Sequence, residues 1–367
     1  MKLMKRLSFF LVLIALFLNL SSYGQSNKAY IDSMAKVFLD HSASSCIVIG
    51  VIDHGKENIY CYGNISKADN IPSNDKTLFE IGSITKLFTA TATAEAMHLG
   101  KLKYNDYIST YMPGVWAPNY HGKEIRIIDL LHHTSGLPAI PDDLFTAGKN
   151  RDSMNPYALY NRSMLDSFIS GHRLDVEPGT KYSYSNLGFG LMGDILSRIE
   201  TKPFEDILRA EIWAALAMDQ TTITLSTEQK KIMAAPYSAK GNPDHIWDFK
   251  ALAGCGAIRS DVTDMLKFLK ASMDPEELKD TLLEASIKDA ETMTFNANKN
   301  LKVGLAWNIS NVNGMPIEWH NGGTGGYRSF LGFNKENETG VVVLTNSATS
   351  VDRPAVKILY DLCQKKN

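Results

Sequence analysis

The chain has 367 residues, of which 44% are hydrophobic and 21% are charged, and its formal net charge is −2. This length supports a large hydrophobic core, in one big domain or in two domains packed together. The near-neutral charge argues against nucleic acid as the main partner.

The N-terminal segment, residues 1–24, has the pattern of a signal peptide. A basic start precedes an apolar run from Leu7 to Leu20, and small residues then suit a peptidase that cleaves after Gly24. A retained transmembrane anchor needs about 20 apolar residues, and this run is shorter. We therefore expect an exported protein, periplasmic or secreted, with no stable membrane anchor after cleavage.

The four cysteines show no spacing that is typical of a metal site or a disulfide framework. Cys46 and Cys61 lie on two strand-like segments that a turn at His54-Gly55 would join. In that register Cys46 faces Gly63, so the two thiols share a face but sit diagonally, which is a poor geometry for a bridge. We expect free thiols.

Strand-like segments occur at both ends of the chain, and helical patterns fill the middle. A helix is expected over 27–41, a β-hairpin over 46–53 and 57–63, and a helix from Ser83 to about Leu99. Further helices are expected over 125–133, 157–170, 187–199, 204–217 and 262–273. Strands are expected over 303–309, 317–323, 327–334 and 340–346, followed by a closing helix over 353–364.

This order of elements favours an α+β fold. One antiparallel sheet is built from both termini and flanked by helices, and a mostly helical domain is inserted between its halves. The expected limits are 25–100 together with 288–367 for the sheet domain, and 101–287 for the insertion. A pocket would then form where the two domains meet.

The helix that begins at Ser83 carries a lysine three residues later, at Lys86. Residues three apart on a helix share a face, so the two side chains can point into one space. A helix N-terminus also offers free N–H groups and partial positive charge, which stabilise an anion on a reacting carbonyl. A capping serine on an ordinary helix gives the same pattern, so S-x-x-K alone does not establish a nucleophile.

A second candidate segment runs from Tyr182 to Gly188 and precedes another expected helix. A cation near Tyr184 would favour its phenolate form, which can take a proton from Ser83 and return it to a leaving group. Asn186 offers a donor and an acceptor to a substrate amide. Aromatic packing at the start of a helix is the alternative interpretation.

The third candidate is a glycine-rich stretch after His320 on an expected strand. Gly322 and Gly323 allow a ligand or another backbone to approach closely. A backbone N–H just past His320 can act with the N–H of Ser83 as a pair of oxyanion donors. A phosphate loop is disfavoured because no G-K-S/T ending and no helix follow. A tight hairpin is the other alternative.

The three patterns Ser83-x-x-Lys86, Tyr184-x-Asn186 and His320-x-Gly322 occur in this order on a helix, a turn and a strand. This ordered set resembles the serine β-lactamase and penicillin-binding-protein superfamily, and in particular its class C branch. That branch includes class C β-lactamases, secreted D-Ala-D-Ala carboxypeptidases and esterases.

The resemblance implies a role for each matching residue. Ser83 is the acylated nucleophile, Lys86 keeps Ser83 and Tyr184 activated, and Tyr184 is the general base and acid. The substrate is contacted by Asn186, His320, Gly322 and Gly323. The oxyanion hole is formed by the backbone N–H groups of Ser83 and Gly323. No metal or cofactor is implied.

The sequence also departs from the class C pattern. His320 stands where class C β-lactamases usually carry lysine, and Asn321 stands where a hydroxyl usually binds the substrate carboxylate. These departures argue against efficient β-lactam hydrolysis. Arg328 could supply a carboxylate contact, although we expect a solvated arginine there. His132 and His133 lack metal-ligand spacing and are expected to be loop scaffolding.

Two related mechanisms are disfavoured, because the sequence has neither the E-x-x-x-N pattern of class A enzymes nor a G-x-S-x-G motif. We therefore expect an exported serine hydrolase that cleaves an amide or an ester through an acyl-enzyme on Ser83. Its substrate would be a β-lactam, a cell-wall peptide or an ester. An esterase of the same fold and a catalytically weak penicillin- or wall-peptide-binding protein are the alternatives, and the oligomeric state stays open.

Overall fold

A computed structural model describes residues 27–145 and 152–365, so the expected signal peptide at 1–24 lies outside the described residues. The described residues divide into two units, with the boundary between Ser42 and Ala43. In the first unit, residues 27–40 form a helix. Within the described ranges, every helix is too short or too polar to cross a membrane.

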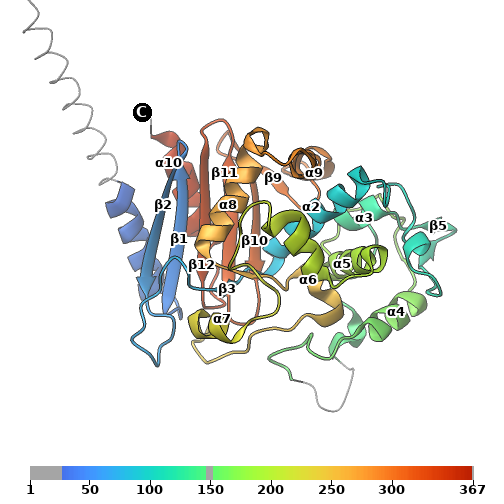
Figure 1. Ribbon diagram of the computed structural model, residues 1–367, viewed down its shortest axis with the longest axis horizontal. Coiled ribbons are helices and arrows are strands. Elements are labelled where there is room, and N and C mark those ends of the chain that lie inside the picture. Colours follow the sequence, from blue (N-terminus) through green and yellow to red (C-terminus); the bar gives the residue numbers. More distant parts are fainter. Residues whose placement is uncertain (1–26, 146–151, 366–367) are drawn as a thin grey trace, which may run out of the picture. The chain divides into compact units, whose positions relative to one another are not determined.

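The second unit is built on one eight-stranded antiparallel sheet with the order β2-β1-β12-β11-β10-β9-β8-β7 (Figure 1). Its strands are β1 (Cys46–Asp53), β2 (Lys56–Gly63), β7 (Phe295–Asn298), β8 (Leu301–Val303), β9 (Asn308–Val312), β10 (Met315–Gly323), β11 (Arg328–Asn334) and β12 (Thr339–Thr345). The N-terminal strand β1 pairs with the C-terminal strand β12. The predicted α+β fold, with one sheet made from both ends of the chain, is confirmed.

The β1–β2 hairpin has the predicted register, with Cys46 opposite Gly63. His54 and Gly55 form its two-residue turn and both have positive φ, at 49° and 77°. A turn of this kind matches the twist of the two strands. All four cysteines are free.

Helices surround the sheet and fill the middle of the chain. They are α2 (Thr85–His98), α3 (Ile127–Leu131), α4 (Arg162–Gly171), α5 (Asn186–Glu200), α6 (Phe204–Leu208), α7 (Thr227–Ile232), α8 (Val262–Met273), α9 (Thr281–Thr292) and α10 (Asp352–Gln364). The predicted helix over 262–273 is confirmed at both ends, and α5 differs from its prediction by one residue at each end.

Several predicted elements differ from the structure, each for a local reason. The helix expected from residue 157 begins at Arg162, because the side chain of Asn161 caps it by accepting the N–H of Met164. The helix expected over 204–217 ends as a π-helical segment, η4 (Arg209–Trp213). The strand expected over 303–309 is broken, and Ala306 lies in the break with φ of 74°.

The faces of the sheet are covered by different helices. α8 packs on β1, β11 and β12, and α10 packs on β11 and β12 from the other side (Figure 1). A Cβ atom at Gly50 of β1 would lie 2.7 Å from Val262 Cγ2, so glycine there lets α8 approach closely. α8 thus packs on the sheet although the predicted boundary places it in the insertion, and the domain limits stay a prediction.

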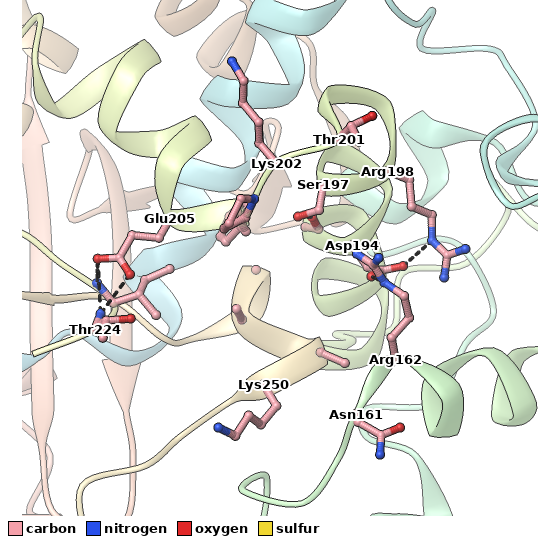
Figure 2. A pocket seen from close by; sticks show the side chains of 17 residues that line it. Asn161, Arg162, Asp194, Ser197, Arg198, Thr201, Lys202, Glu205, Thr224 and Lys250 are labelled. Carbon is pink, nitrogen blue, oxygen red and sulfur yellow. Dashed lines mark hydrogen bonds and ion pairs between the residues drawn. The ribbon is translucent and has the colours of Figure 1, made fainter.

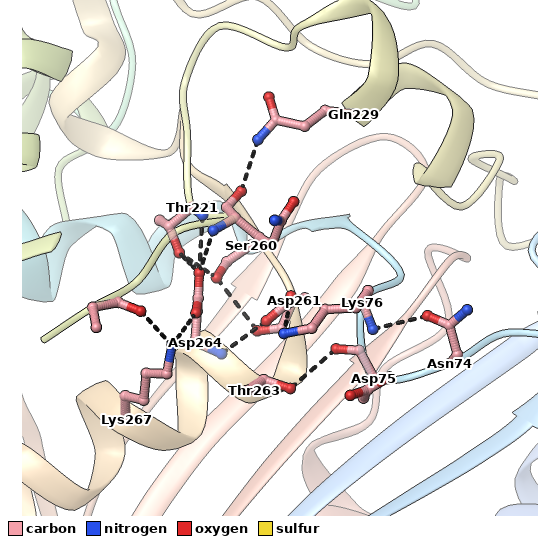
Figure 3. A network of polar contacts seen from close by, with 12 residues as sticks. Asn74, Asp75, Lys76, Thr221, Gln229, Ser260, Asp261, Thr263, Asp264 and Lys267 are labelled. Carbon is pink, nitrogen blue, oxygen red and sulfur yellow. Dashed lines mark hydrogen bonds and ion pairs between the residues drawn. The ribbon is translucent and has the colours of Figure 1, made fainter. Parts of the chain in front are cut away.

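A short strand pair positions the segment that leads to Ser83. β3 (Phe79–Glu80) pairs with β6 (Arg259–Ser260), which immediately precedes α8. Figure 3 shows the polar network around this junction. The Asp264 carboxylate accepts hydrogen bonds from Thr221 N at 3.0 Å and Lys267 Nζ at 2.9 Å, and Asp261 caps α8. Thr221 Oγ1 also hydrogen-bonds with Ser260 Oγ of β6 at 2.8 Å, so the network fixes β6 and, through it, β3.

Candidate active site

Ser83 lies in a tight turn, η1 (Gly82–Ile84), directly before α2. The turn requires glycine at position 82, where φ is +50° and a Cβ atom would lie 2.5 Å from Gly323 N. The end of β10 therefore lies against the turn that carries Ser83. The Ser83 side chain is partly exposed, as a nucleophile must be to meet a substrate.

Lys86 is fully buried beside Ser83. Its Nζ atom donates to Ser83 Oγ at 3.0 Å, to Asn186 Oδ1 at 2.7 Å and to the carbonyl oxygen of Cys255 at 2.7 Å. An ammonium group has three protons, and these three bonds use all of them. In this arrangement Lys86 is a donor to Ser83 and links it to Asn186.

Tyr184 lies beside Lys86. The Nζ atom of Lys86 lies 4.9 Å from the centre of the Tyr184 ring, and 5.8 Å from that of Phe189. A cation at this distance is attracted by the face of an aromatic ring. Tyr184 is partly exposed. Ser185 caps α5 by accepting the N–H of Gly188 at 2.9 Å, so Asn186 begins the helix.

His320 and Gly322 lie on the face of β10 that looks toward the Ser83 turn. A Cβ atom at Gly322 would lie 1.9 Å from the carbonyl oxygen of Ile81, so only glycine fits there. Ser329 Oγ, from the neighbouring strand, donates to the same carbonyl at 2.8 Å. β9 pairs with β10 only over Met315–Trp319, so the strand edge from residue 320 onward lies beyond the end of β9.

The His320 ring is buried, and its Nδ1–H donates to the carbonyl oxygen of Asn321 at 2.6 Å. Burial lowers the pKa of His320 to about 3, assisted by the nearby charge of Lys86 and opposed by this hydrogen bond. The ring is therefore neutral at neutral pH. A histidine in place of the usual lysine removes a positive charge from this position.

Asn321, the other departure from the class C pattern, and Arg328 lie on the opposite face of the sheet. Asn321 Nδ2 donates to Asp352 Oδ2 of α10 at 2.9 Å, so this side chain is directed away from the Ser83 turn. Arg328 is not the solvated arginine we expected. It is half-buried beside Gly323, and its Nη1 donates to the carbonyl oxygens of Thr324 and Tyr327. Neither side chain contacts Ser83.

The structure brings two aromatic residues to the site that the sequence did not identify. The ring of His133 lies 4.4 Å from that of Tyr184. The hydroxyl of Tyr157 interacts with Asn186, and its ring stacks on Phe249 at 4.6 Å. In the chain, His133 lies 51 residues before Tyr184, and Tyr157 lies 29 residues before Asn186 and 92 before Phe249. No local pattern therefore connects these residues.

A separate cavity of about 830 Å³ lies between α4, α5, α6 and the segment η5 (Lys250–Cys255), as Figure 2 shows. We call it the Asp194 cavity, because the carboxylate of Asp194 accepts bonds from Arg162 Nε and Arg198 Nε, each at 2.5 Å. None of the predicted site residues lines it.

Comparison with known proteins places this geometry in context. The family profile described as Beta-lactamase matches residues 31–364. A β-lactamase from Pseudomonas fluorescens is 25% identical over 349 residues, which cover 86% of this chain and 92% of that protein. The D-alanyl-D-alanine-carboxypeptidase/endopeptidase AmpH of Escherichia coli (strain K12) is 26% identical over 329 residues, with coverage of 84% and 83%.

A crystal structure gives the same fold. The β-lactamase/D-alanine carboxypeptidase from Pseudomonas syringae superposes with a TM-score of 0.81 at 22% identity. The match covers 93% of this chain and 99% of that one. The sheet, its covering helices and the helical segment between the strands therefore recur in a solved protein.

Proposed function

The chain belongs to the Beta-lactamase family, and from this premise we propose that it is an exported serine hydrolase that forms an acyl-enzyme on Ser83. Its substrates would be amides or esters of the β-lactam or D-Ala peptide type. The observation that carries this proposal is the buried Lys86, whose ammonium group donates to Ser83 Oγ at 3.0 Å while its other two protons are also engaged.

The proposed first step is attack on the substrate carbonyl. Ser83 Oγ forms a bond to the carbonyl carbon as the Tyr184 phenolate takes the proton from the hydroxyl. The carbonyl oxygen becomes an anion, which the N–H groups of Ser83 and Gly323 bind. The bond to the leaving amine or alcohol then breaks, and Tyr184 returns the proton to that group. Lys86 keeps its own proton throughout.

The second step is hydrolysis of the ester on Ser83. A water molecule attacks the acyl carbon while the Tyr184 phenolate takes one of its protons, and the bond to Ser83 Oγ breaks as that proton returns to the serine. The acid product leaves and the enzyme regains its starting state. The rate of this step separates a β-lactamase from a slowly deacylating peptidase.

The strand edge of β10 supports an extended, peptide-like substrate. Residues 320–323 lie beyond the end of β9, and such an edge can pair with the backbone of an added segment. The neutral His320 ring supplies no cation for a substrate carboxylate. This favours a neutral ester as a second candidate substrate. The ratio of kcat/KM for a nitrophenyl ester and for a D-Ala-D-Ala peptide would distinguish the two.

The experiment that tests this proposal is incubation of the protein with a fluorescent penicillin, followed by intact mass over time. A long-lived adduct indicates a peptidase-type enzyme, and rapid turnover with little adduct indicates a β-lactamase. The Ser83→Ala variant is the control and should form no adduct. Failure of the wild-type protein to react with any penicillin, nitrophenyl ester or D-Ala-D-Ala peptide would contradict the proposal.

A further inference from the structure

His133 ends the short turn that follows α3. Its N–H donates to the carbonyl oxygen of Leu130 at 3.2 Å, and its backbone is left-handed, with φ of 57°. Histidine adopts this conformation more readily than most residues other than glycine. The side chain is buried, with 2% of its surface exposed. A buried polar ring needs partners, and the partners of His133 show what it holds in place.

Both neighbours of Tyr184 are hydrogen-bonded to this one residue. The N–H of Ser183 donates to the carbonyl oxygen of His133 at 2.7 Å. The N–H of Ser185 donates to His133 Nδ1 at 3.0 Å. The backbone of Tyr184 is thus held on its N-terminal side by the main chain of His133 and on its C-terminal side by the ring.

The ring of His133 also packs against the side chain of Tyr184. Its centre lies 4.4 Å from the Tyr184 ring, at an interplanar angle of 35°, and 4.8 Å from the Phe189 ring. Phe189 lies in turn 5.8 Å from Lys86 Nζ. The three rings therefore form a wall beside the buried ammonium group.

We propose that His133 is a positioning residue for Tyr184, which it holds beside Lys86 through these two hydrogen bonds and the ring contact. This inference rests on the proposed role of Tyr184 as the base that takes the proton of Ser83. A base has to be held within hydrogen-bond reach of its proton, and a displacement of about 1 Å can cost about 100-fold in rate.

The bond to Ser185 fixes the protonation state of His133. Nδ1 accepts an N–H, so the ring hydrogen is on Nε2 and the ring is neutral. Burial, followed by the charges of Lys86 and His320, lowers the pKa of His133 well below its ordinary value. A second proton would occupy Nδ1 and break the bond to Ser185. The neutral ring is therefore the form that can hold Tyr184.

The other ring nitrogen takes no part in holding Tyr184. Nε2 is buried, and the described part of the chain provides it with no hydrogen-bond partner. The features that reach Tyr184 are the acceptor at Nδ1 and the flat face of the ring, and histidine supplies both.

Two substitutions separate the effect of the acceptor at Nδ1 from the effect of the flat ring. His133→Asn keeps an acceptor close to the place of Nδ1 and removes the ring, whereas His133→Phe keeps a ring and leaves the N–H of Ser185 unpaired. We expect each variant to acylate Ser83 about 10- to 100-fold more slowly. KM should change less than about twofold, and the acid limb of the rate–pH profile should shift, because the base is misplaced while the substrate contacts remain. Rates are counted per folded molecule.

His132→Asn is the matched control. The ring of His132 is adjacent in the chain, but its Nε2 contacts the carbonyl oxygen of Met293 at 3.0 Å and no residue of the Ser83 site. This variant should lose thermal stability and keep the wild-type acylation rate and pH profile. If both His133 variants also keep the wild-type rate and profile, the positioning role is wrong, while the proposed function stands.

A second measurement is independent of any reaction. Amide hydrogen exchange in His133→Phe should become faster at Ser185, which loses its acceptor, and should stay slow at Ser183, which keeps the carbonyl of residue 133. Unchanged exchange at Ser185 overturns the inference about His133, whatever the result with penicillin. If the wild-type protein fails to react with penicillin, that failure counts against the proposed function and not against the contacts of His133.

Discussion

The Ser83 site and the Asp194 cavity differ in how their charged side chains are paired. In the cavity, Asp194 is shared by Arg162 and Arg198, and Arg198 also pairs with Asp166 at 2.5 Å. At the Ser83 site, Lys86 is fully buried, and its three hydrogen-bond partners are a hydroxyl, an amide and a carbonyl. One region balances its charges, and the other holds a cation against neutral groups.

This difference indicates which of the two regions is suited to catalysis. Paired charges are satisfied and gain little from a further proton transfer, so a wide opening such as the Asp194 cavity needs no catalytic role. An unbalanced buried cation stabilises whatever negative charge develops beside it, and such environments are typical of functional sites. The size of an opening is therefore a poorer guide to the chemistry than the balance of its charges.

The largest expected effect comes from removing the unbalanced charge. Lys86→Ala leaves Ser83 Oγ, Asn186 Oδ1 and the Cys255 carbonyl without their shared donor and removes the cation that lies 4.9 Å from the centre of the Tyr184 ring. We expect acylation to slow by about 10³-fold or more. Stopped-flow fluorescence with a labelled penicillin measures this rate. A loss of less than tenfold in a folded variant would show that the cation is not part of the reaction.

The next largest effect concerns the close approach of β10 to the Ser83 turn. In Gly82→Ala, the new Cβ would lie 2.5 Å from Gly323 N, so β10 and the Ser83 turn must move apart. We expect about a 100-fold slower acylation, similar to the loss of one oxyanion donor.

Gly55→Ala is the control for that variant, because Gly55 also has positive φ, at +77°, but its Cβ would meet nothing within 4 Å. Both variants should lose about 1 kcal/mol from the strained backbone alone. Only Gly82→Ala should lose activity. Equal acylation rates in the two variants would show that the close contact between Gly323 and the Ser83 turn does not matter for the reaction.

A substitution in the balanced region should act on stability alone. Asp194→Asn removes the carboxylate that two guanidinium groups share, and this carboxylate is almost fully buried. We expect the free energy of unfolding to fall by about 2–4 kcal/mol. The acylation rate per folded molecule should stay within about twofold. Urea unfolding and the penicillin assay on one preparation give both values, and a large change in rate would make the cavity part of the site.

The smallest effect concerns Glu80, which precedes the Ser83 turn. Its Oε1 accepts the N–H of Trp247 at 2.8 Å, while no partner is found for Oε2 in the described ranges. Burial raises the pKa of Glu80 from 4.5 to about 7, partly offset by Arg259. The folded state then holds the proton more tightly than the unfolded chain does.

The sign of the pH dependence follows from this shift. The contribution of Glu80 to stability is fully present below about pH 4.5 and is lost as the pH rises through about 7. Glu80→Gln should therefore flatten the stability profile between pH 5 and 8, by an amount on the order of 2 kcal/mol. Thermal unfolding across this range measures the slope, and parallel profiles for the two proteins would contradict the assignment.

The sequence predicted the fold because its main signals are local. The β1–β2 register follows from a turn at His54-Gly55, and the helix over 262–273 follows from its apolar period. Strand breaks depend on single backbone angles, such as φ of 74° at Ala306, and no composition pattern indicates them.

The candidate site was predicted in part for the same reason. Ser83-x-x-Lys86 is a local pattern, and the structure joins it to Asn186. The contacts of His133 with Tyr184 could not be predicted, because His133 lies 51 residues before Tyr184 in the chain and meets it only in the folded state. The direction of Asn321 was also hidden, since it depends on which face of β10 looks toward α10.

The most direct test of the central claim is to identify the residue that becomes acylated. The protein is mixed with a fluorescent penicillin, quenched at short times and digested, and the labelled peptide is sequenced by tandem mass spectrometry. The label should lie on Ser83, and it should be absent from Ser83→Ala and slow to form in Lys86→Ala. A label on another residue, or one that forms in Ser83→Ala at the wild-type rate, would contradict it.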